Sequence, residues 1–281
     1  MRYFILLSYN GTDYCGWQIQ HNARSIQGEI EKALSTLLNE PINITGAGRT
    51  DTSVHASTYY AHFNSSKTEI LSDHPYFIYK INAILPLNIA INNIFQVHKD
   101  AHARFDATER TYKYYIHTVK NPFHQDFSYY FKFPLDIGLM NKACEYLIGE
   151  KDFSCFEKVG SQTINAICDL KYAHWSYIMD DSQKYADSHL IKISNRLVFT
   201  ITANRFLRNM VRAIVGSMTE IGRGKHDPTW ILELLESKNR SKAGSSVTGK
   251  ALFLEKIKYP YITDDGNYLD GYIKDNNKND A

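Results

Sequence analysis

The chain has 281 residues, of which 43% are hydrophobic and 22% charged, a composition typical of a folded globular protein. The formal net charge is only +2, which by itself argues nothing about nucleic acid. No apolar run approaches the ~18–20 residues that a membrane-spanning helix needs, so the sequence excludes a transmembrane protein of that kind.

Charge is unevenly distributed along the chain. Between Arg196 and Lys225, six basic residues stand against one glutamate, for a local net charge of +5. Such a cluster is typical of a polyanion-binding surface or, alternatively, of a solvated helix face. Residues 262–281 hold five aspartates and two lysines, a net charge of −3, and are rich in Asn and Gly. This composition predicts a flexible acidic tail.

The four cysteines have no CxxC pairing and no metal-ligand spacing. They are expected to be reduced thiols in a reducing compartment. The N-terminus starts with an apolar, strand-like run and carries no cleavable signal pattern. A cytoplasmic protein is therefore expected.

Hydrophobic periodicity and turn signals predict alternating strands and helices. In chain order, the patterns predict a strand at 2–9, a helix at 25–38, strands at 42–45 and 54–63, a helix at 75–84, strands at 90–97 and 112–119, a helix at 140–147, strands at 169–177 and 190–203, helices at 206–221 and 228–236, and a strand at 252–259. Ser25 is the expected N-cap of the first helix. Arg205, Arg208 and Arg212 are spaced to share one face of the helix at 206–221.

The alternation has no steady βα period and no glycine-rich nucleotide-binding fingerprint. It predicts an α+β fold with mainly antiparallel sheet in place of a doubly wound one. A boundary near residues 101–104 divides the chain into two halves of similar size. We expect an N-terminal α+β domain at 1–103 and a C-terminal α+β domain at 104–261, followed by the acidic tail at 262–281.

The most informative segment is GAGRTDTSVH at residues 46–55, which sets Arg49 and Asp51 in a loop rich in glycine and threonine. Glycine lets the backbone approach a ligand closely. A neighbouring arginine favours an ionised carboxylate, which can act as a nucleophile or base. The alternative is structural, with Asp51 capping a turn or helix and Arg49 as its surface partner. By itself, a motif this short favours the structural alternative.

A series of further segments changes that balance. They are YCGWQ at 14–18, GRTD at 48–51 followed by Val54 and His55, NAILP at 82–86, HARFDAT at 102–108, RTYKY at 110–114, and NMVR at 209–212 with IVG at 214–216. In this order, and over residues 2–260, they resemble the tRNA pseudouridine synthase A family. That family isomerises uridine to pseudouridine at positions 38, 39 and/or 40 of the tRNA anticodon stem-loop.

The resemblance implies that Asp51 is the catalytic carboxylate, that Tyr112 is the active-site tyrosine, and that Arg49 and Arg212 are their basic partners. It implies two α+β halves whose antiparallel sheets meet at a central catalytic cleft, usually in a homodimer. The substrate is then tRNA, and neither a metal nor an organic cofactor is implied.

The reaction breaks the C1′–N1 bond of uridine, rotates the base and joins C1′ to C5, so an ionised carboxylate serves and no redox cofactor is needed. Arg212 is expected to orient Asp51, Tyr112 to stack on the uracil, and Arg49 to fill the gap that a flipped uridine leaves or to hold its phosphate. The structural alternative for Tyr112 is a strand aromatic of the core. Five basic residues are expected to bind the tRNA backbone: Arg104, Arg110, Lys113, Arg205 and Arg208.

Two segments depart from the family pattern. Thr52-Ser53 stands where Ala-Gly is usual, and AGSSVT at 243–248 replaces a stretch like Ala-Gly-Pro-Thr-Ala-Pro. If the usual Gly has a positive φ, Ser53 is expected to cost about 1 kcal/mol or more of strain. If that Gly only lets RNA approach closely, Ser53 adds a hydroxyl at the site. The loop at 243–248 is expected near the cleft.

Other readings of the same residues are weaker. His55 and His62 are interpreted as structural and not as metal ligands of a site with Asp51, because a third clear ligand is missing. Two rival functions are a tRNA-binding module without catalysis and a hydrolase that uses Asp51 on another polyanion. The sequence offers the hydrolase no second carboxylate, and the shared presence of Asp51, Tyr112, Arg49 and Arg212 argues against a binding module.

Overall fold

The structure, a computed structural model, describes residues 1–68, 70, 73–161, 164–178 and 195–269. Its strands are β1 (Arg2–Tyr9), β2 (Thr45–Gly46), β3 (His55–Asn64), β4 (Ile89–Val97), β5 (Glu109–His117), β6 (Tyr129–Tyr130), β7 (Gly149–Asp152), β8 (Ile167–Tyr177), β9 (Arg196–Ala203) and β10 (Leu252–Lys258). Its α-helices are α1 (Ile26–Leu38), α3 (His74–Ile84), α4 (Ile137–Glu145), α5 (Met210–Gly222) and α6 (Trp230–Ser237). Within the described ranges, no helix is long and apolar enough to cross a membrane.

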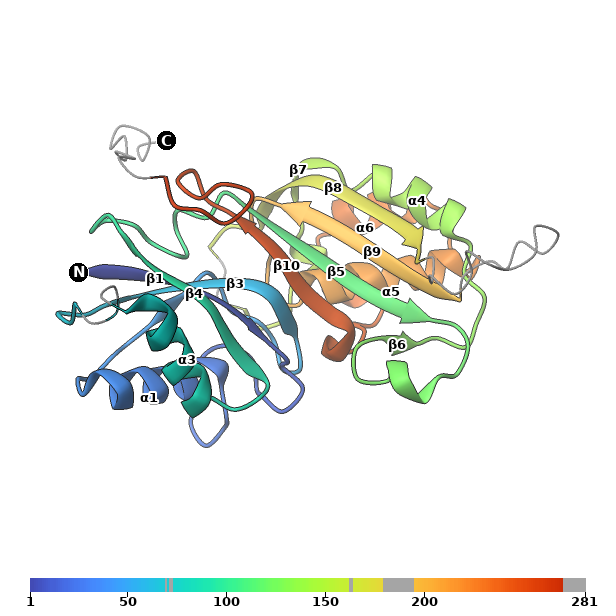
Figure 1. Cartoon of the computed structure of the whole chain (residues 1–281). Helices are drawn as coiled ribbons and strands as arrows, with labels where there is room; N and C mark the ends of the chain where they lie inside the picture. The colour runs from blue at the N-terminus through green and yellow to red at the C-terminus, as the bar shows by residue number, and fades with distance from the viewer. Residues whose placement is uncertain (69, 71–72, 162–163, 179–194, 270–281) are drawn as a thin grey trace.

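The strands form one sheet in the order β4-β1-β3-β10-β5-β9-β8-β7, with β2 paired to β3 and β6 to β5 (Figure 1). The pairing is antiparallel except between β10 and β3 and between β5 and β6. β10 lies between β3 and β5 and so joins the N-terminal half of the sheet to the C-terminal half. The predicted α+β fold with mainly antiparallel sheet is confirmed.

The N-terminal half of the sheet packs against α1 and α3 (Figure 1). The sequence forms α1 because apolar residues recur at helical spacing behind a good N-cap. As predicted, the cap is Ser25, whose Oγ accepts a hydrogen bond from the backbone N–H of Gly28. The helix buries Ile26, Ile30, Ala33, Leu34 and Leu38, and Leu37 is partly buried.

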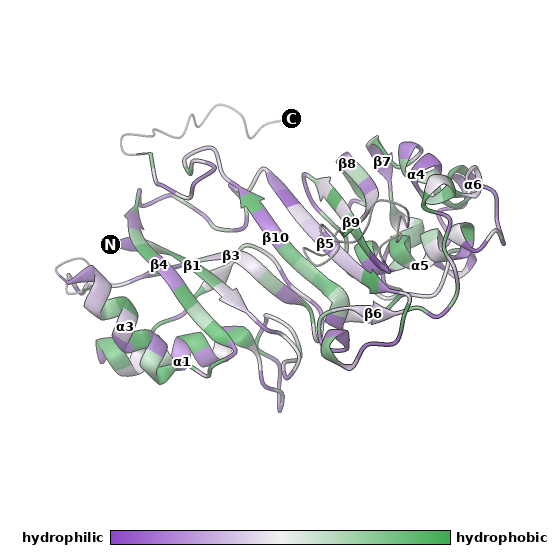
Figure 2. Ribbon diagram, turned by 45° about the vertical axis from the view of Figure 1, so that its right-hand side comes forward, coloured by the Kyte–Doolittle hydropathy of each residue, from purple (hydrophilic) through white to green (hydrophobic). Residues whose placement is uncertain are grey.

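The C-terminal half of the sheet has helices on one face only, since α4, α5 and α6 all lie behind β5, β9 and β8 in Figure 1. Strand β9 shows the consequence, because its buried residues alternate strictly with half-exposed ones. In Figure 2, β8 and β9 carry both green and purple segments, whereas β5 is mostly white to purple. The face opposite the helices is therefore open.

The buried apolar residues divide into two clusters. One gathers around β1, β3, β4 and the first two helices, and also takes in Leu254–Tyr261 near the C-terminus. The other gathers around β5, β8, β9 and α5. Tyr112 packs against both clusters. The division into domains at 1–103 and 104–261 stays a prediction.

One predicted helix begins in the wrong place. The pattern at 206–221 predicts a helix from Phe206, whereas α5 begins at Met210. The preceding Asn209 has φ 67°, in the left-handed region, which ends any helical run that comes before it. Arg205 and Arg208 therefore lie in a loop, and the prediction that they share a helix face with Arg212 is wrong.

Smaller differences concern the short elements. The strand predicted at 42–45 is only β2, and β6 and β7 are additional strands that the patterns do not predict. Residues 190–194, the start of another predicted strand, lie outside the described residues. The first residues of the predicted flexible tail belong to the folded structure. Leu269 N donates to Tyr261 O at 3.0 Å, and the Tyr268 hydroxyl accepts from His98 N at 3.1 Å. The remainder of that segment, residues 270–281, also lies outside the described residues.

Candidate active site

Asp51 lies in the loop between β2 and β3, and the backbone of that loop is held on both sides. Thr50 O accepts a hydrogen bond from Trp17 N at 3.4 Å, and Ser53 N donates to Tyr14 O at 3.2 Å. The Thr50 hydroxyl also shares a buried hydrogen bond of 3.0 Å with the hydroxyl of Tyr9. The carboxylate is thus carried by a loop whose position is fixed by the segment at residues 9–17.

Two glycines allow this close packing. Gly16 has φ +95°, and a Cβ there would lie 2.1 Å from Thr50 O. A Cβ on Gly249, far along the chain, would lie 2.4 Å from Thr52 O. Neither position accepts a side chain without displacing the loop. The glycine of YCGWQ therefore has a structural reason to accompany Asp51.

The structure brings Arg212 to Asp51, although 161 residues separate them. Arg212 Nη1 donates to Asp51 Oδ2 at 3.1 Å, and each side chain is 22% exposed. On the other carboxylate oxygen, Arg208 Nε lies 3.8 Å from Oδ1, with its side chain 59% exposed. Asp51 is therefore paired by one half-buried and one exposed arginine, which contact its two carboxylate oxygens separately.

Tyr112 is the third predicted residue near the carboxylate. Burial raises the pKa of Tyr112 to about 12, an effect that Arg110 opposes and the negative charge of Asp51 reinforces. The ring stands edge-on to Phe206, with the ring centroids 5.1 Å apart. Its hydroxyl is therefore neutral at physiological pH and lies within the electrostatic influence of Asp51.

Arg49 is exposed, two residues before Asp51. Its side chain has no hydrogen bond or ion pair to any of the described residues, so the surface pairing with Asp51 that the structural alternative required is not observed. Its role toward a flipped nucleotide stays a prediction.

The five predicted backbone-binding residues fall into two groups. Arg104, Arg205 and Arg208 are exposed, as a phosphate contact requires. Arg110 instead donates to four backbone carbonyls, those of Ala107, Asn204, Arg104 and Ala47, at 2.7 to 3.3 Å. Lys113 forms an ion pair of 2.8 Å with Glu255 and, as the next residue along β5, points to the sheet face opposite Tyr112. The geometry thus gives Arg110 and Lys113 protein partners.

The two departures from the family pattern both lie at this site. Ser53 has φ 62°, so the first of the two alternatives, a strained backbone, applies here, and its Oγ donates to Thr12 O at 3.3 Å. The loop at 243–248 lies against α5, where Val247 O accepts from Arg212 Nε at 2.7 Å. Val247 was missed as a site residue because a backbone contact leaves no mark on residue type.

His55 and His62 have backbone partners. His55 Nδ1 accepts from Gly11 N at 3.1 Å and its Nε2 lies 2.9 Å from Lys250 O, while His62 Nδ1 accepts from Ala103 N at 3.1 Å. Within the described ranges, no cluster of three or more His, Cys, Asp or Glu residues is arranged to hold a metal ion.

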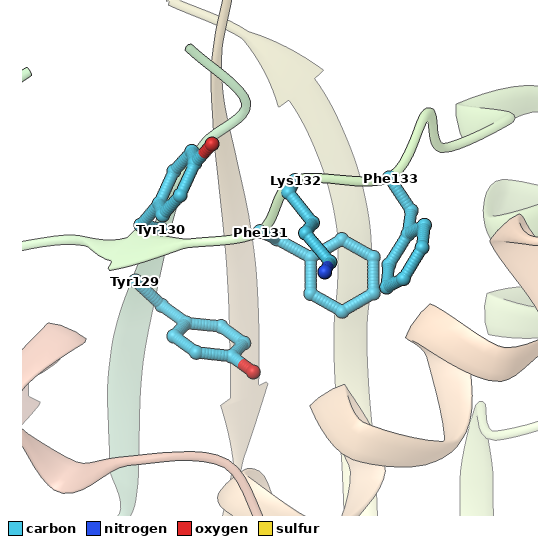
Figure 3. Close-up of a pocket in the computed structure, with 5 residues that line it drawn as sticks. All are labelled: Tyr129, Tyr130, Phe131, Lys132 and Phe133. Carbon is cyan, nitrogen blue, oxygen red and sulfur yellow. The ribbon is translucent and has the colours of Figure 1, made fainter. Parts of the chain in front are cut away.

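Two hollows are formed elsewhere on the molecule. One of about 210 Å³ is lined by Tyr129–Phe133, as Figure 3 shows, and another of about 520 Å³ lies between α5, α6 and Lys242–Ser245. Neither is lined by a predicted site residue. The ion pair of Asp51 and Arg212 lies instead at a partly exposed position where α5 meets the β2–β3 loop.

The α+β fold and the arginine-paired aspartate of the GRTD loop agree with what the resemblance to the tRNA pseudouridine synthase A family implies. Residues 143–260 match the profile of the family described as tRNA pseudouridine synthase. Relatives named tRNA pseudouridine synthase A include those of Bacteroides fragilis and Bacteroides thetaiotaomicron, 45% and 44% identical, and that of Aliivibrio salmonicida, 38% identical. Each similarity covers 92% of this chain and 91 to 96% of the relative. The chain belongs to the tRNA pseudouridine synthase A family, whose members are isomerases.

Proposed function

We propose that this chain converts uridine to pseudouridine at positions 38, 39 and/or 40 of the tRNA anticodon stem-loop, with Asp51 as the catalytic carboxylate. The observation that carries the proposal is the 3.1 Å pair between Asp51 and Arg212, formed by the hydrogen-bonded β2–β3 loop and the first turn of α5. The names of the relatives support tRNA as the substrate. The anticodon stem-loop comes from the resemblance of the motifs.

In the proposed reaction, the C1′–N1 bond of uridine breaks, the uracil rotates, and C1′ joins C5; the C5 proton is released to solvent and N1 takes up a proton in its place. The ionised Asp51 either adds covalently to the substrate or removes the 2′ hydrogen of the ribose to give a glycal-type intermediate. No electrons are gained or lost, so neither route needs an oxidant or reductant.

The neighbours of Asp51 have distinct proposed roles. Arg212 orients the carboxylate through its hydrogen bond, while Tyr112 stacks on the uracil and offers its neutral hydroxyl near C5. Arg49 fills the gap left by the flipped nucleotide or holds its phosphate, which offsets part of the few kcal/mol that unstacking costs. The exposed Arg104, Arg205 and Arg208 bind the flanking phosphates. In this proposal the site combines Arg49 and Asp51 from the domain proposed at 1–103 with Tyr112 and Arg212 from the domain proposed at 104–261.

We also propose a homodimer, using the open face of the C-terminal half of the sheet. The segment at residues 123–127, beside that face, has two exposed aromatic side chains: Phe123 is 90% and Phe127 45% exposed. Phe127 also approaches Phe253 of β10, their ring centroids 6.1 Å apart. Sedimentation equilibrium tests this proposal, since a dimer mass that falls to the monomer mass in Phe127→Glu supports it and a monomeric unsubstituted protein refutes it.

A cytoplasmic location is proposed on the chemistry of the cysteines. Cys15, Cys144, Cys155 and Cys168 are all free thiols. This state matches a reducing compartment, where tRNA is modified. Cell fractionation tests the location directly.

The activity is tested with tRNA transcripts that carry tritium at C5 of uridine. We expect tritium release and pseudouridine within the anticodon stem-loop, and neither with Asp51→Asn. Asp13→Asn, an exposed carboxylate in a turn, is the matched control and should keep full activity. Tight tRNA binding without release in the unsubstituted protein would favour the binding module, and release that survives Asp51→Asn would overturn the assigned carboxylate.

A further inference from the structure

The position of Arg212 depends on the loop at 243–248, which this family member has altered. Arg212 Nε donates to Val247 O at 2.7 Å, and Val247 N donates to Arg212 O at 3.2 Å. The guanidinium is thus held between a loop carbonyl on one side and Asp51 on the other. A shift of the loop relative to α5 would move the guanidinium away from the carboxylate.

The first part of the loop is pressed directly on α5. A Cβ on Gly216 would lie 1.9 Å from Ser245 O, and Gly244 N donates to Ser217 Oγ at 3.0 Å. At the other end, Thr248 O accepts a hydrogen bond of 3.0 Å from the Tyr114 hydroxyl. These contacts fix the two ends of the loop and leave Ser246 and Val247 between them.

Ser246 provides the link in the middle. Its Oγ accepts hydrogen bonds from Asn209 Nδ2 at 2.6 Å and from Arg240 Nη2 at 2.8 Å. Asn209 adopts the left-handed conformation from which α5 starts, one turn before Arg212. Arg240 is partly buried, and burial lowers its pKa, so its guanidinium depends on such acceptors. One hydroxyl therefore joins the loop, the start of α5 and a partly buried cation.

We propose that Ser246 is a positioning residue, which sets the loop carbonyl that holds Arg212 and thereby aims Arg212 at Asp51. The proposal rests on the proposed function, because it takes Asp51 and Arg212 to be the catalytic pair. Ser246→Ala leaves Asn209 and Arg240 without their shared acceptor. A displacement of about 1 Å in a catalytic group can reduce a rate by ~100-fold.

We expect Ser246→Ala to lower the single-turnover rate of tritium release by about 10- to 100-fold, with KM for tRNA within about twofold. Ser246→Thr keeps the hydroxyl and should restore most of the rate. Ser245→Ala is the matched control, since the Ser245 side chain is exposed and hydrogen-bonds to none of the described residues. Asn209→Gly, which accepts the left-handed φ without strain, should reproduce the rate loss in a folded protein even if Ser246→Ala is unstable.

An unchanged rate in both Ser246→Ala and Asn209→Gly overturns the proposal, as does a rise in KM without a change in rate. A crystal structure of Ser246→Ala provides a readout that does not depend on activity. If Arg212 keeps its contacts with Val247 and Asp51 there, the positioning role is refuted even where the rate of tritium release has fallen. An unsubstituted protein that releases no tritium refutes the proposed function instead.

Discussion

Arg212→Lys separates the charge of Arg212 from its geometry. The guanidinium uses two atoms in two directions, with Nε on Val247 O at 2.7 Å and Nη1 on Asp51 Oδ2 at 3.1 Å. Lysine keeps the positive charge but has one ammonium, which can reach the carbonyl or the carboxylate and not both. We therefore expect the single-turnover rate to fall by about 100-fold, equivalent to ~2.7 kcal/mol of transition-state stabilisation.

The matched control for Arg212→Lys is Arg208→Lys. Arg208 is 59% exposed and lies 3.8 Å from the same carboxylate, where an ion pair contributes only ~0–1 kcal/mol. The control should therefore lose less than about fivefold in rate. Both variants are compared by single-turnover tritium release at saturating enzyme, which excludes product release. A rate for Arg212→Lys within about threefold of the unsubstituted protein would refute the idea that its geometry, beyond its charge, aims Asp51.

Three further predictions concern stability. Ser53→Gly relieves the strain of a φ of 62° but also removes a 3.3 Å hydrogen bond to Thr12 O, so urea unfolding should show a net gain of about 0.5 kcal/mol in unfolding free energy. Ser53→Ala should lower the unfolding free energy, and a decrease with Ser53→Gly would contradict the assigned strain. Arg110→Ala leaves backbone carbonyls of several segments without their donor and should lower the unfolding free energy by about 2–4 kcal/mol. An unchanged melting temperature would contradict this structural role of Arg110. Burial lowers the pKa of His62 from 6.5 to about 4, so the unfolded state binds more protons in that window and the unfolding free energy should fall as pH falls from 6.5 to 4; His62→Gln should remove this part of the slope.

Periodicity predicts this fold well wherever one face of an element is buried. β1, α1, β4 and β10 lie within a residue or two of their expected limits, because their apolar residues follow the period of the element. The start of α5 was misplaced because Phe206 and Leu207 continue the apolar pattern backwards. The helix cannot extend back through Asn209, because this residue has a left-handed φ. Asparagine permits this conformation but does not require it, so the sequence does not predict it.

The candidate site was predictable only in part. Asp51, Arg212 and Tyr112 stand in motifs; the structure pairs Asp51 with Arg212 and places Tyr112 where burial and the charge of Asp51 raise its pKa. Arg110 also stands in a motif, yet its guanidinium donates hydrogen bonds to backbone carbonyls. Charge and motif membership do not distinguish a phosphate-binding arginine from one that holds loops together, because that depends on whether unpaired carbonyls lie within reach.

The strain at Ser53 need not disturb the chemistry of Asp51, because the loop between them is held at several independent points. Thr50 O is fixed by Trp17 N, Thr52 O lies against Gly249, and Ser53 N is bound to Tyr14 O. A conformation that costs ~1 kcal/mol persists when its surroundings over-determine it. The substitution of serine for glycine in this family member is therefore absorbed as lower stability and not as movement of the carboxylate. Ser53→Gly should accordingly change the unfolding free energy and leave the rate of tritium release unaltered, and a changed rate would show that the loop is held less firmly than its contacts indicate.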